Sequence, residues 1–301
     1  MKNSYILFLI IFLPTLVFSQ SRRWERTRYE LVGATGTTNF MGELGGSDKE
    51  GSSYFRDFEI SSSRPLMHLG LRYKILEPLA VRTSITYGWL HGDDAKTENI
   101  YRKDRNIHFR SPIVEFSTQV EYSIIKEKSG HRYNLRRGKR FSLQALQVNT
   151  YIFAGIAGFY FNPKAKDIEG DGKWHALQPL GTEGQGIIPT RDKYKRFQMA
   201  VPLGFGFKYN ITRTIAVGLE YGARITFTDY IDDVSTTYVD PAIFGDNELA
   251  RRMADPSIGD VPGLSAVNSQ RGNPGDDDFY MFTLISVNYK LNTGRNGLPK
   301  F

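Results

Sequence analysis

Two long stretches of the chain alternate strictly between apolar and non-apolar side chains. Apolar residues occupy every odd position of Phe197–Tyr209 and of Ile215–Phe227. The even positions carry small residues together with the charged residues Lys208, Glu220 and Arg224. A period of two over such lengths predicts two antiparallel β-strands joined by the short connection between them.

The length and the facing of these strands are unusual for a water-soluble sheet. Soluble strands are about half as long and place their apolar face inside. At about 3.3 Å per residue, Phe197–Tyr209 spans about 40 Å, or about 30 Å in height when tilted by about 40°. This height matches the apolar band of a membrane barrel with its flanking aromatic residues. We therefore expect the apolar residues at the odd positions to face lipid and the residues at the even positions, which include the charged ones, to face inward.

Six further segments have the alternation or the composition of strands, at about 28–40, 65–76, 79–89, 114–124, 148–161 and 279–291. For residues 148–161 the sequence does not show which side chains face lipid, because the odd and the even positions are both apolar. Eight strands is an even number, and short and long connections alternate between them. This pattern predicts an all-β fold, an eight-stranded antiparallel transmembrane β-barrel of the OmpA-like kind with a filled polar interior.

The long connections are expected outside the cell, and the short turns and both termini in the periplasm. The predicted extracellular loops span about 41–63, 91–109, 162–194 and 230–277. One further connection, at about 127–147, is longer than the tight turns usual on the periplasmic side.

The start of the chain predicts export. Lys2 precedes an apolar run that ends near Phe18, so residues 1–19 are expected to be a secretory signal peptide and residues 20–301 a single barrel domain. After Gln20 no apolar stretch of about 18 residues occurs, which excludes a helical membrane protein. The chain contains no cysteine, which excludes disulfides and thiolate metal sites. The expected location is the outer membrane of a Gram-negative cell.

An eight-stranded barrel leaves room inside for side chains and little else, so we expect a filled lumen. Unpaired charges there would be costly, so acids and bases should pair across strands. The predicted pairing residues are Arg72, Arg82, Glu115, Glu121, Glu220 and Arg224, and Arg82 with Glu121 is the best single candidate. Further inward candidates are His68, Lys74, Gln119, Lys208 and Lys290. A structural plug is favoured over an ion path or a catalytic cluster.

Positive charge concentrates in the connection at 127–147, whereas the last long loop is acidic. The basic residues expected to bind a partner are Arg132, Arg136, Arg137, Lys139 and Arg140. Nucleic acid is a poor fit for an exported barrel. Anionic lipid headgroups of the outer membrane would attract this charge. Docking onto an acidic periplasmic protein also accounts for the extra length, which lipid attraction does not require.

Two acidic segments are candidate cation sites. Asp167–Gly172 resembles the start of a calcium loop, but its twelfth position is Gln178 and no helices are expected to flank it. A solvated glycine-rich turn is the favoured interpretation. The run Asp276–Asp278 could bind a hard cation weakly, although such runs are usually solvated. We therefore expect no metal site and no cofactor.

Catalytic chemistry has little support in the sequence. Some outer-membrane barrels hydrolyse lipid with a serine, a histidine and an acid, and His91 or His108 near Ser111 could imitate this arrangement. Triads are recognised by geometry and not by sequence position, so this similarity carries little weight. No nucleophile elbow or phosphate-binding loop is present. We expect no catalytic residues and a chain that is not an enzyme.

Three segments of the chain resemble the PorG-like outer-membrane barrels of the type IX secretion system: Gly33–Leu44 (GATGTTNFMGEL), Phe161–Ala165 (FNPKA) and Thr228–Pro241 (TDYIDDVSTTYVDP). The last is the most specific, and the resemblance covers nearly all of the mature chain. It implies a non-enzymatic barrel that associates with a periplasmic ring built from a lipoprotein and its soluble partner. No catalytic residues follow from it. The alternative is an autonomous surface barrel whose outer loops bind a ligand or act on lipid.

Overall fold

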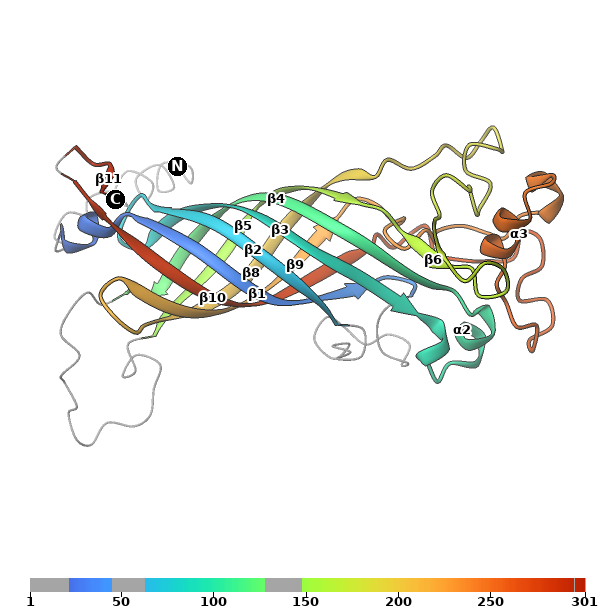
Figure 1. Ribbon diagram of the computed structural model, residues 1–301, viewed down its shortest axis with the longest axis horizontal. Helices are drawn as coiled ribbons and strands as arrows, with labels where there is room; N and C mark the ends of the chain where they lie inside the picture. The colour runs from blue at the N-terminus through green and yellow to red at the C-terminus, as the bar shows by residue number, and fades with distance from the viewer. Residues whose placement is uncertain (1–21, 45–62, 128–147, 295, 301) are drawn as a thin grey trace, which may run out of the picture.

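The computed structural model describes residues 22–44, 63–127, 148–294 and 296–300. Within these residues, eight antiparallel strands form one closed ring, in which β3 pairs with β4 and β1 with β10. The predicted eight-stranded barrel is therefore confirmed, and it is seen from the side in Figure 1. The strands are β1 (Tyr29–Met41), β2 (Arg64–Lys74), β3 (Leu79–Asp93), β4 (His108–Ile125), β5 (Asn149–Phe161), β8 (Phe197–Asn210), β9 (Ile215–Thr226) and β10 (Phe279–Thr293).

The two ends of the barrel differ in their connections. The end with the short β2–β3 and β8–β9 connections, residues 75–78 and 211–214, is called the turn end here. The opposite end, called the loop end, carries the connections at 94–107, 162–196 and 227–278. The described chain termini, η2 (Arg22–Thr27) and β11 (Pro299–Lys300), lie at the turn end, on the left of Figure 1. None of the described helices is long and apolar enough to cross a membrane.

Short elements occupy the long loops. These are η4 (Asp94–Lys96), α2 (Ile100–Arg105), β6 (Lys164–Lys166), β7 (Trp174–Ala176), η5 (Pro241–Phe244) and α3 (Glu248–Ala254). The predicted polar loop at 91–109 needs correction, because β3 extends to Asp93, β4 begins at His108 and η4 and α2 lie between them. A six-residue helix is too short to produce a hydrophobic period. It is stabilised instead by its cap, where Asn99 accepts hydrogen bonds from Tyr101 N and Arg102 N.

The outward face of the barrel is apolar. On β2, Met67 and Leu69 have 72% and 65% of their surface exposed, while His68 between them is buried. The facing of β5, open from the sequence, is now settled: Ile152 and Ile156 point outward, and Phe153 is buried inside. This inversion of the soluble pattern is the arrangement that a lipid surrounding favours.

The lumen is filled, and its contents change along the axis. Charged side chains fill the part nearer the turn end, called the charged zone here. The part nearer the loop end, called the apolar zone, holds buried residues that include Phe40, Leu66, Leu90, Phe109, Ile113, Phe159, Phe161, Tyr280 and Phe282. The expectation of a filled interior is met, but its polar character holds only for the charged zone. The inward-facing residues of β5 near the loop end are aromatic. This is why the inward and the outward positions of that strand are both apolar.

Candidate functional site

The charged zone contains all six residues predicted to pair inside the barrel, and all six are buried. Arg72 Nε lies 2.6 Å from Glu121 Oε2, and Arg82 Nε lies 3.1 Å from Glu121 Oε1. The predicted contact of Arg82 with Glu121 is therefore present. Arg82 also reaches Glu220, with 2.6 Å between Nη2 and Oε1. Since β3 and β9 lie opposite each other in the ring, the contact of Arg82 with Glu220 crosses the whole lumen.

A second pair lies at the boundary with the apolar zone. Arg224 Nε is 3.3 Å from Glu115 Oε2, and the Tyr280 hydroxyl donates to the same oxygen at 2.8 Å. The Arg224 guanidinium carbon lies 4.0 Å from the centroid of the Phe282 ring. The ion pair is thus in contact with aromatic side chains of β10.

Sequence reasoning missed two acids of the charged zone, and the first is Glu30 on β1. Its carboxylate lies 2.8 Å from Arg72 Nη1, 2.8 Å from Lys74 Nζ and 2.9 Å from Lys208 Nζ. Glu30 lies on a strand rich in glycine and threonine, where the apolar alternation is weak. The only indication in the sequence was that Glu30 lies two residues before Val32, on the side of the strand that faces inward.

The second missed acid is Glu127. Its sequence position assigns it to the basic connection, but the structure places it against the lumen cations. Its carboxylate lies 2.6 Å from Lys74 Nζ and 3.4 Å from Lys208 Nζ, and it also pairs with Lys290. Glu127 therefore neutralises cations at the turn end of the charged zone. No feature of its sequence context indicates this.

The charged zone connects strands that are not neighbours in the sheet. Its ion pairs link β1 with β8, β2 with β4, β3 with β9 and β4 with β9. Buried charges are tolerated only when they are paired and hydrogen-bonded. The arrangement fills the lumen and fixes the strands across it, which is the chemistry expected of a plug.

The predicted partner-binding residues Arg132, Arg136, Arg137, Lys139 and Arg140 lie outside the described residues. The strands on either side of their connection are β4, which ends at Ile125, and β5, which begins at Asn149. Both of these strand ends lie at the turn end, because Tyr122 on β4 pairs with Leu79 next to the short β2–β3 connection. The basic connection therefore leaves and re-enters the barrel at the turn end.

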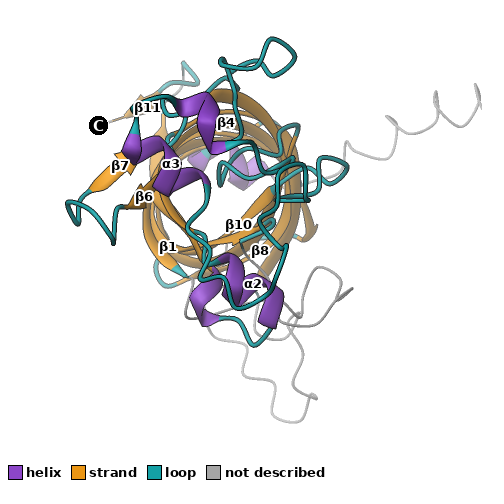
Figure 2. Ribbon diagram, turned by 90° about the vertical axis from the view of Figure 1, so that its right-hand side faces the viewer, coloured by secondary structure: helices purple, strands orange, loops and turns teal. Residues whose placement is uncertain are grey.

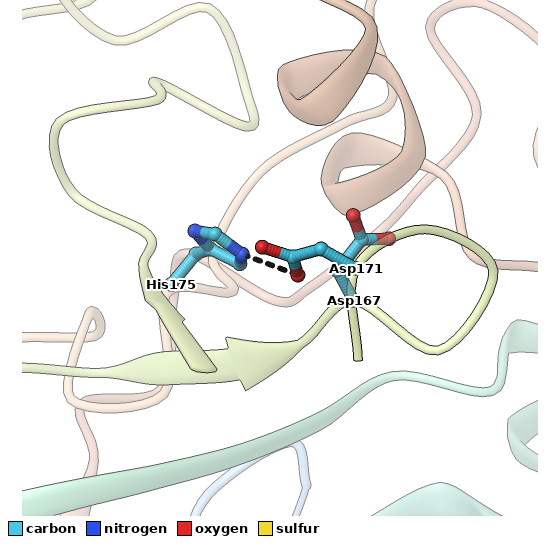
Figure 3. A group of neighbouring side chains, drawn as sticks. All are labelled: Asp167, Asp171 and His175. Carbon is cyan, nitrogen blue, oxygen red and sulfur yellow. Dashed lines mark hydrogen bonds and ion pairs between the residues drawn. The ribbon is translucent and has the colours of Figure 1, made fainter. Parts of the chain in front are cut away.

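The calcium-like segment Asp167–Gly172 forms a turn between β6 and β7 at the loop end. Asp167 accepts two hydrogen bonds from Arg252 on α3, at 3.0 Å and 2.7 Å, and these lower the pKa of its carboxyl. Asp171 Oδ1 lies 2.9 Å from His175 Nε2, which lowers the pKa of Asp171 (Figure 3). Asp167, Asp171 and His175 have ligand atoms within 4.8 Å of one another. Because Arg252 already neutralises Asp167, this group is poorly suited to a cation.

The histidines near Ser111 do not form a triad with it. His91 Nδ1 lies 2.9 Å from the Phe109 carbonyl oxygen, and His108 Nε2 accepts from Lys166 N at 3.0 Å. Ser111 Oγ accepts a hydrogen bond from Asn162 N at 2.9 Å. The serine and both histidines therefore have other partners, which hold the backbone of the loops.

The long loops are tied to one another over the loop end, which faces the viewer in Figure 2. Glu183 accepts from Ser235 N and Thr236 N at 3.0 Å each and pairs with Arg271 at 2.9 Å. The Tyr194 hydroxyl donates to Asp233 at 2.6 Å. These contacts involve residues of the Thr228–Pro241 segment, so that segment is fastened above the apolar zone.

Comparisons with known proteins find one family and several solved structures to which this chain is similar. The family described as outer membrane protein beta-barrel domain matches residues 8–240. The N-terminal β-barrel domain of OprF from Pseudomonas aeruginosa is 9% identical, with 88% of this chain and 98% of that chain covered and a TM-score of 0.35. Neisserial surface protein A is 8% identical, with 88% and 97% covered and a TM-score of 0.39. A major outer membrane protein from Thermus thermophilus is 13% identical, with 87% and 99% covered and a TM-score of 0.37. No curated protein matches the chain significantly.

Proposed function

Given that the chain belongs to the family of outer membrane protein β-barrel domains, we propose that it is a non-enzymatic component of a protein secretion machinery. The machinery is of the type IX kind, and the chain is its PorG-like barrel. It sits in the outer membrane with the turn end and both termini in the periplasm. The three segments that resemble PorG-like barrels, above all Thr228–Pro241, support the assignment.

The basic connection is the proposed docking surface. The observation that supports this proposal is that the strand ends on either side of the connection, Ile125 and Asn149, both lie at the turn end. In the proposed orientation, its basic residues face the periplasmic ring, a lipoprotein with its soluble partner. Charge complementarity then selects an acidic partner and speeds its association. The plugged lumen supports a structural role, because it offers no wide path for a substrate.

Neutralising the docking surface should abolish the association. The test changes Arg136, Arg137, Lys139 and Arg140 together to glutamine in the intact cell. We expect the ring proteins to be lost from the purified barrel and cargo secretion to fall, because the charge that attracts the acidic partner is gone. The measurement is affinity purification from solubilised envelopes, together with the amount of secreted cargo.

A matched control changes the same number of charges at the other end of the barrel. Lys166, Lys173, Lys193 and Lys195 are exposed at the loop end, and their replacement by glutamine should leave co-purification unchanged. Unchanged co-purification of the neutralised but folded docking variant would contradict the proposal. Crosslinking from positions in the 127–147 connection then identifies the partner directly.

The alternative is an autonomous surface barrel whose loops bind a ligand or act on lipid. A deletion strain separates the two functions. Loss of cargo secretion is the result expected here, whereas normal secretion with an altered envelope would favour the alternative.

A further inference from the structure

A cluster of three acids lies at the mouth of the barrel, at the loop end. Glu43 follows β1, Asp232 lies in the loop after β9, and Asp278 directly precedes β10. Each offers a carboxylate oxygen, and the three oxygens lie within 4.8 Å of one another. Three segments that are far apart in sequence therefore bring their carboxylates to one point.

No described side chain neutralises this cluster. Among the described residues, no basic side chain forms an ion pair with Glu43, Asp232 or Asp278. The Arg105 guanidinium attracts the carboxylates of Glu43 and Asp232 electrostatically. Arg105 is held by Asp94 at 2.7 Å, and it donates to the Arg271 carbonyl oxygen at 2.8 Å and to the Glu43 carbonyl oxygen at 2.9 Å. The acceptors of these hydrogen bonds are Asp94 and two backbone carbonyl oxygens, and none is one of the three carboxylates.

Two buried oxygens of the cluster have no hydrogen-bond partner among the described residues. Asp278 is 1% exposed, and no described residue donates a hydrogen bond to its Oδ1 or to Oε2 of Glu43. Asp229, outside the group of three, is 7% exposed, and neither of its oxygens has a partner within bonding distance. Burial and the like charge of Glu43 raise the pKa of Asp229 to about 8, and they outweigh the Ser235 side chain, which lowers it. Unpartnered buried carboxylate oxygens are rare, and a site for an ion is one established reason for them.

Other oxygens of the cluster are positioned by backbone N–H groups. Asp278 Oδ2 accepts from Ile231 N at 2.8 Å, and Asp232 Oδ1 accepts from Val234 N at 3.0 Å. Glu43 Oε1 accepts from Asn273 N at 2.8 Å. Metal-binding carboxylates are typically oriented by such outer hydrogen bonds, and each oxygen keeps a second lone pair.

Gly42 allows the close approach of β1 to Asp278. A Cβ atom at this position would lie 2.0 Å from Asp278 Oδ1. Any other residue at position 42 would therefore clash with this oxygen. The glycine lets Asp278 pack against the chain directly before Glu43, which brings the two carboxyl groups together.

We propose that Glu43, Asp232 and Asp278 bind one calcium ion, with Asp229 as an adjacent acid, and that this ion fastens the last long loop to β1 and β10. Calcium takes six to eight oxygen ligands at about 2.3–2.6 Å, so oxygens on opposite sides of the ion are about 5 Å apart. The spacing of the three carboxylates fits this range. Magnesium prefers shorter distances, stricter octahedral geometry and retained waters, so it should bind more weakly.

The test uses the full mature chain, folded in detergent and stripped with a chelator. Calcium chloride is titrated by calorimetry, with magnesium chloride as the second probe. We expect one saturable calcium site with a dissociation constant of about 10⁻⁴–10⁻³ M, the range of extracellular calcium modules. Asp278→Asn should weaken calcium binding by at least about tenfold, because it removes a charged ligand.

Asp277→Asn is the matched control, because Asp277 is the exposed neighbour in the same acidic run. It should leave the calcium affinity within about twofold of the wild type, since exposed carboxylates contribute little. Asp232→Asn provides a second variant, and a heat-modifiable gel shift shows that each variant is folded. In chelator, Asp278→Asn should unfold at the same or a higher temperature than the wild type, because it relieves repulsion between like charges.

Two results would overturn the proposal. One is a folded wild-type chain with no saturable calcium binding up to about 10 mM, ten times the upper limit of the expected range. The other is unchanged calcium affinity in folded Asp278→Asn. Either result would mean that Glu43, Asp232 and Asp278 do not form a calcium site.

Discussion

Replacing Glu30 by glutamine should lower the free energy of unfolding by about 3–5 kcal/mol, the cost of removing one partner from a buried ion pair. Glu30 is fully buried and lies within 3 Å of side-chain nitrogens of Arg72, Lys74 and Lys208. Glutamine has nearly the same shape but no charge, so these cations lose a shared counterion inside the lumen. The measurement is equilibrium unfolding in urea of the mature chain folded into lipid vesicles.

Glu77→Gln is the matched control for this change. Glu77 pairs with Lys126 at 3.2 Å near the turn end, and the two side chains are 23% and 41% exposed. Exposed ion pairs contribute about 0–1 kcal/mol, so the control should change the stability by no more than that. Equal losses in the two variants would mean that Glu30 is not part of a buried charged network.

Phe159→Ala should cost about 3–5 kcal/mol in the free energy of unfolding, the usual range for emptying a buried aromatic site. Phe159 is fully buried in the apolar zone, with ring centroids of Phe161 and Tyr280 at 5.6 Å and 5.4 Å. Its removal leaves a cavity among rigid strands that cannot collapse to fill it. The same vesicle unfolding experiment measures the loss.

Phe116→Ala is the comparison for a side chain that faces lipid. Phe116 is 60% exposed on the outward face of β4. Lipid can fill the space that its ring leaves, so only the transfer contribution is lost and no cavity forms. The loss should therefore be smaller than for Phe159→Ala. A loss as large as that of Phe159→Ala would show that the apolar zone is not closely packed.

The barrel was predictable from the sequence because lipid imposes a strict pattern on side chains. Strands such as β8 and β9 show apolar residues at every second position, and the charged positions between them, including Glu220 and Arg224, all point inward. The contact of Arg82 with Glu121 was predicted from their similar heights on neighbouring strands. In the register Arg82 lies opposite Gln119 and Glu121 lies opposite Ala80, so the two residues are diagonal neighbours.

The features that the sequence did not reveal depend on tertiary contacts. Glu127 folds back onto lumen lysines, and no local pattern distinguishes it from the basic residues that follow. The inward aromatic residues of β5 concealed its facing, because the loop-end lumen is as apolar as lipid. The run Asp276–Asp278 illustrates the same limit: Asp278 is buried and its two identical neighbours are exposed. That difference arises where the chain enters β10.

The most direct test of a barrel sealed by its own side chains is conductance across a planar lipid bilayer. The folded mature chain is inserted, insertion is checked by recovery of protein from the membrane, and an open porin serves as the positive control. Because ion pairs fill the charged zone and aromatic rings fill the apolar zone, the expected result is no steady large conductance. Steady, large conductance steps from the inserted protein would contradict the sealed lumen and the structural role that rests on it.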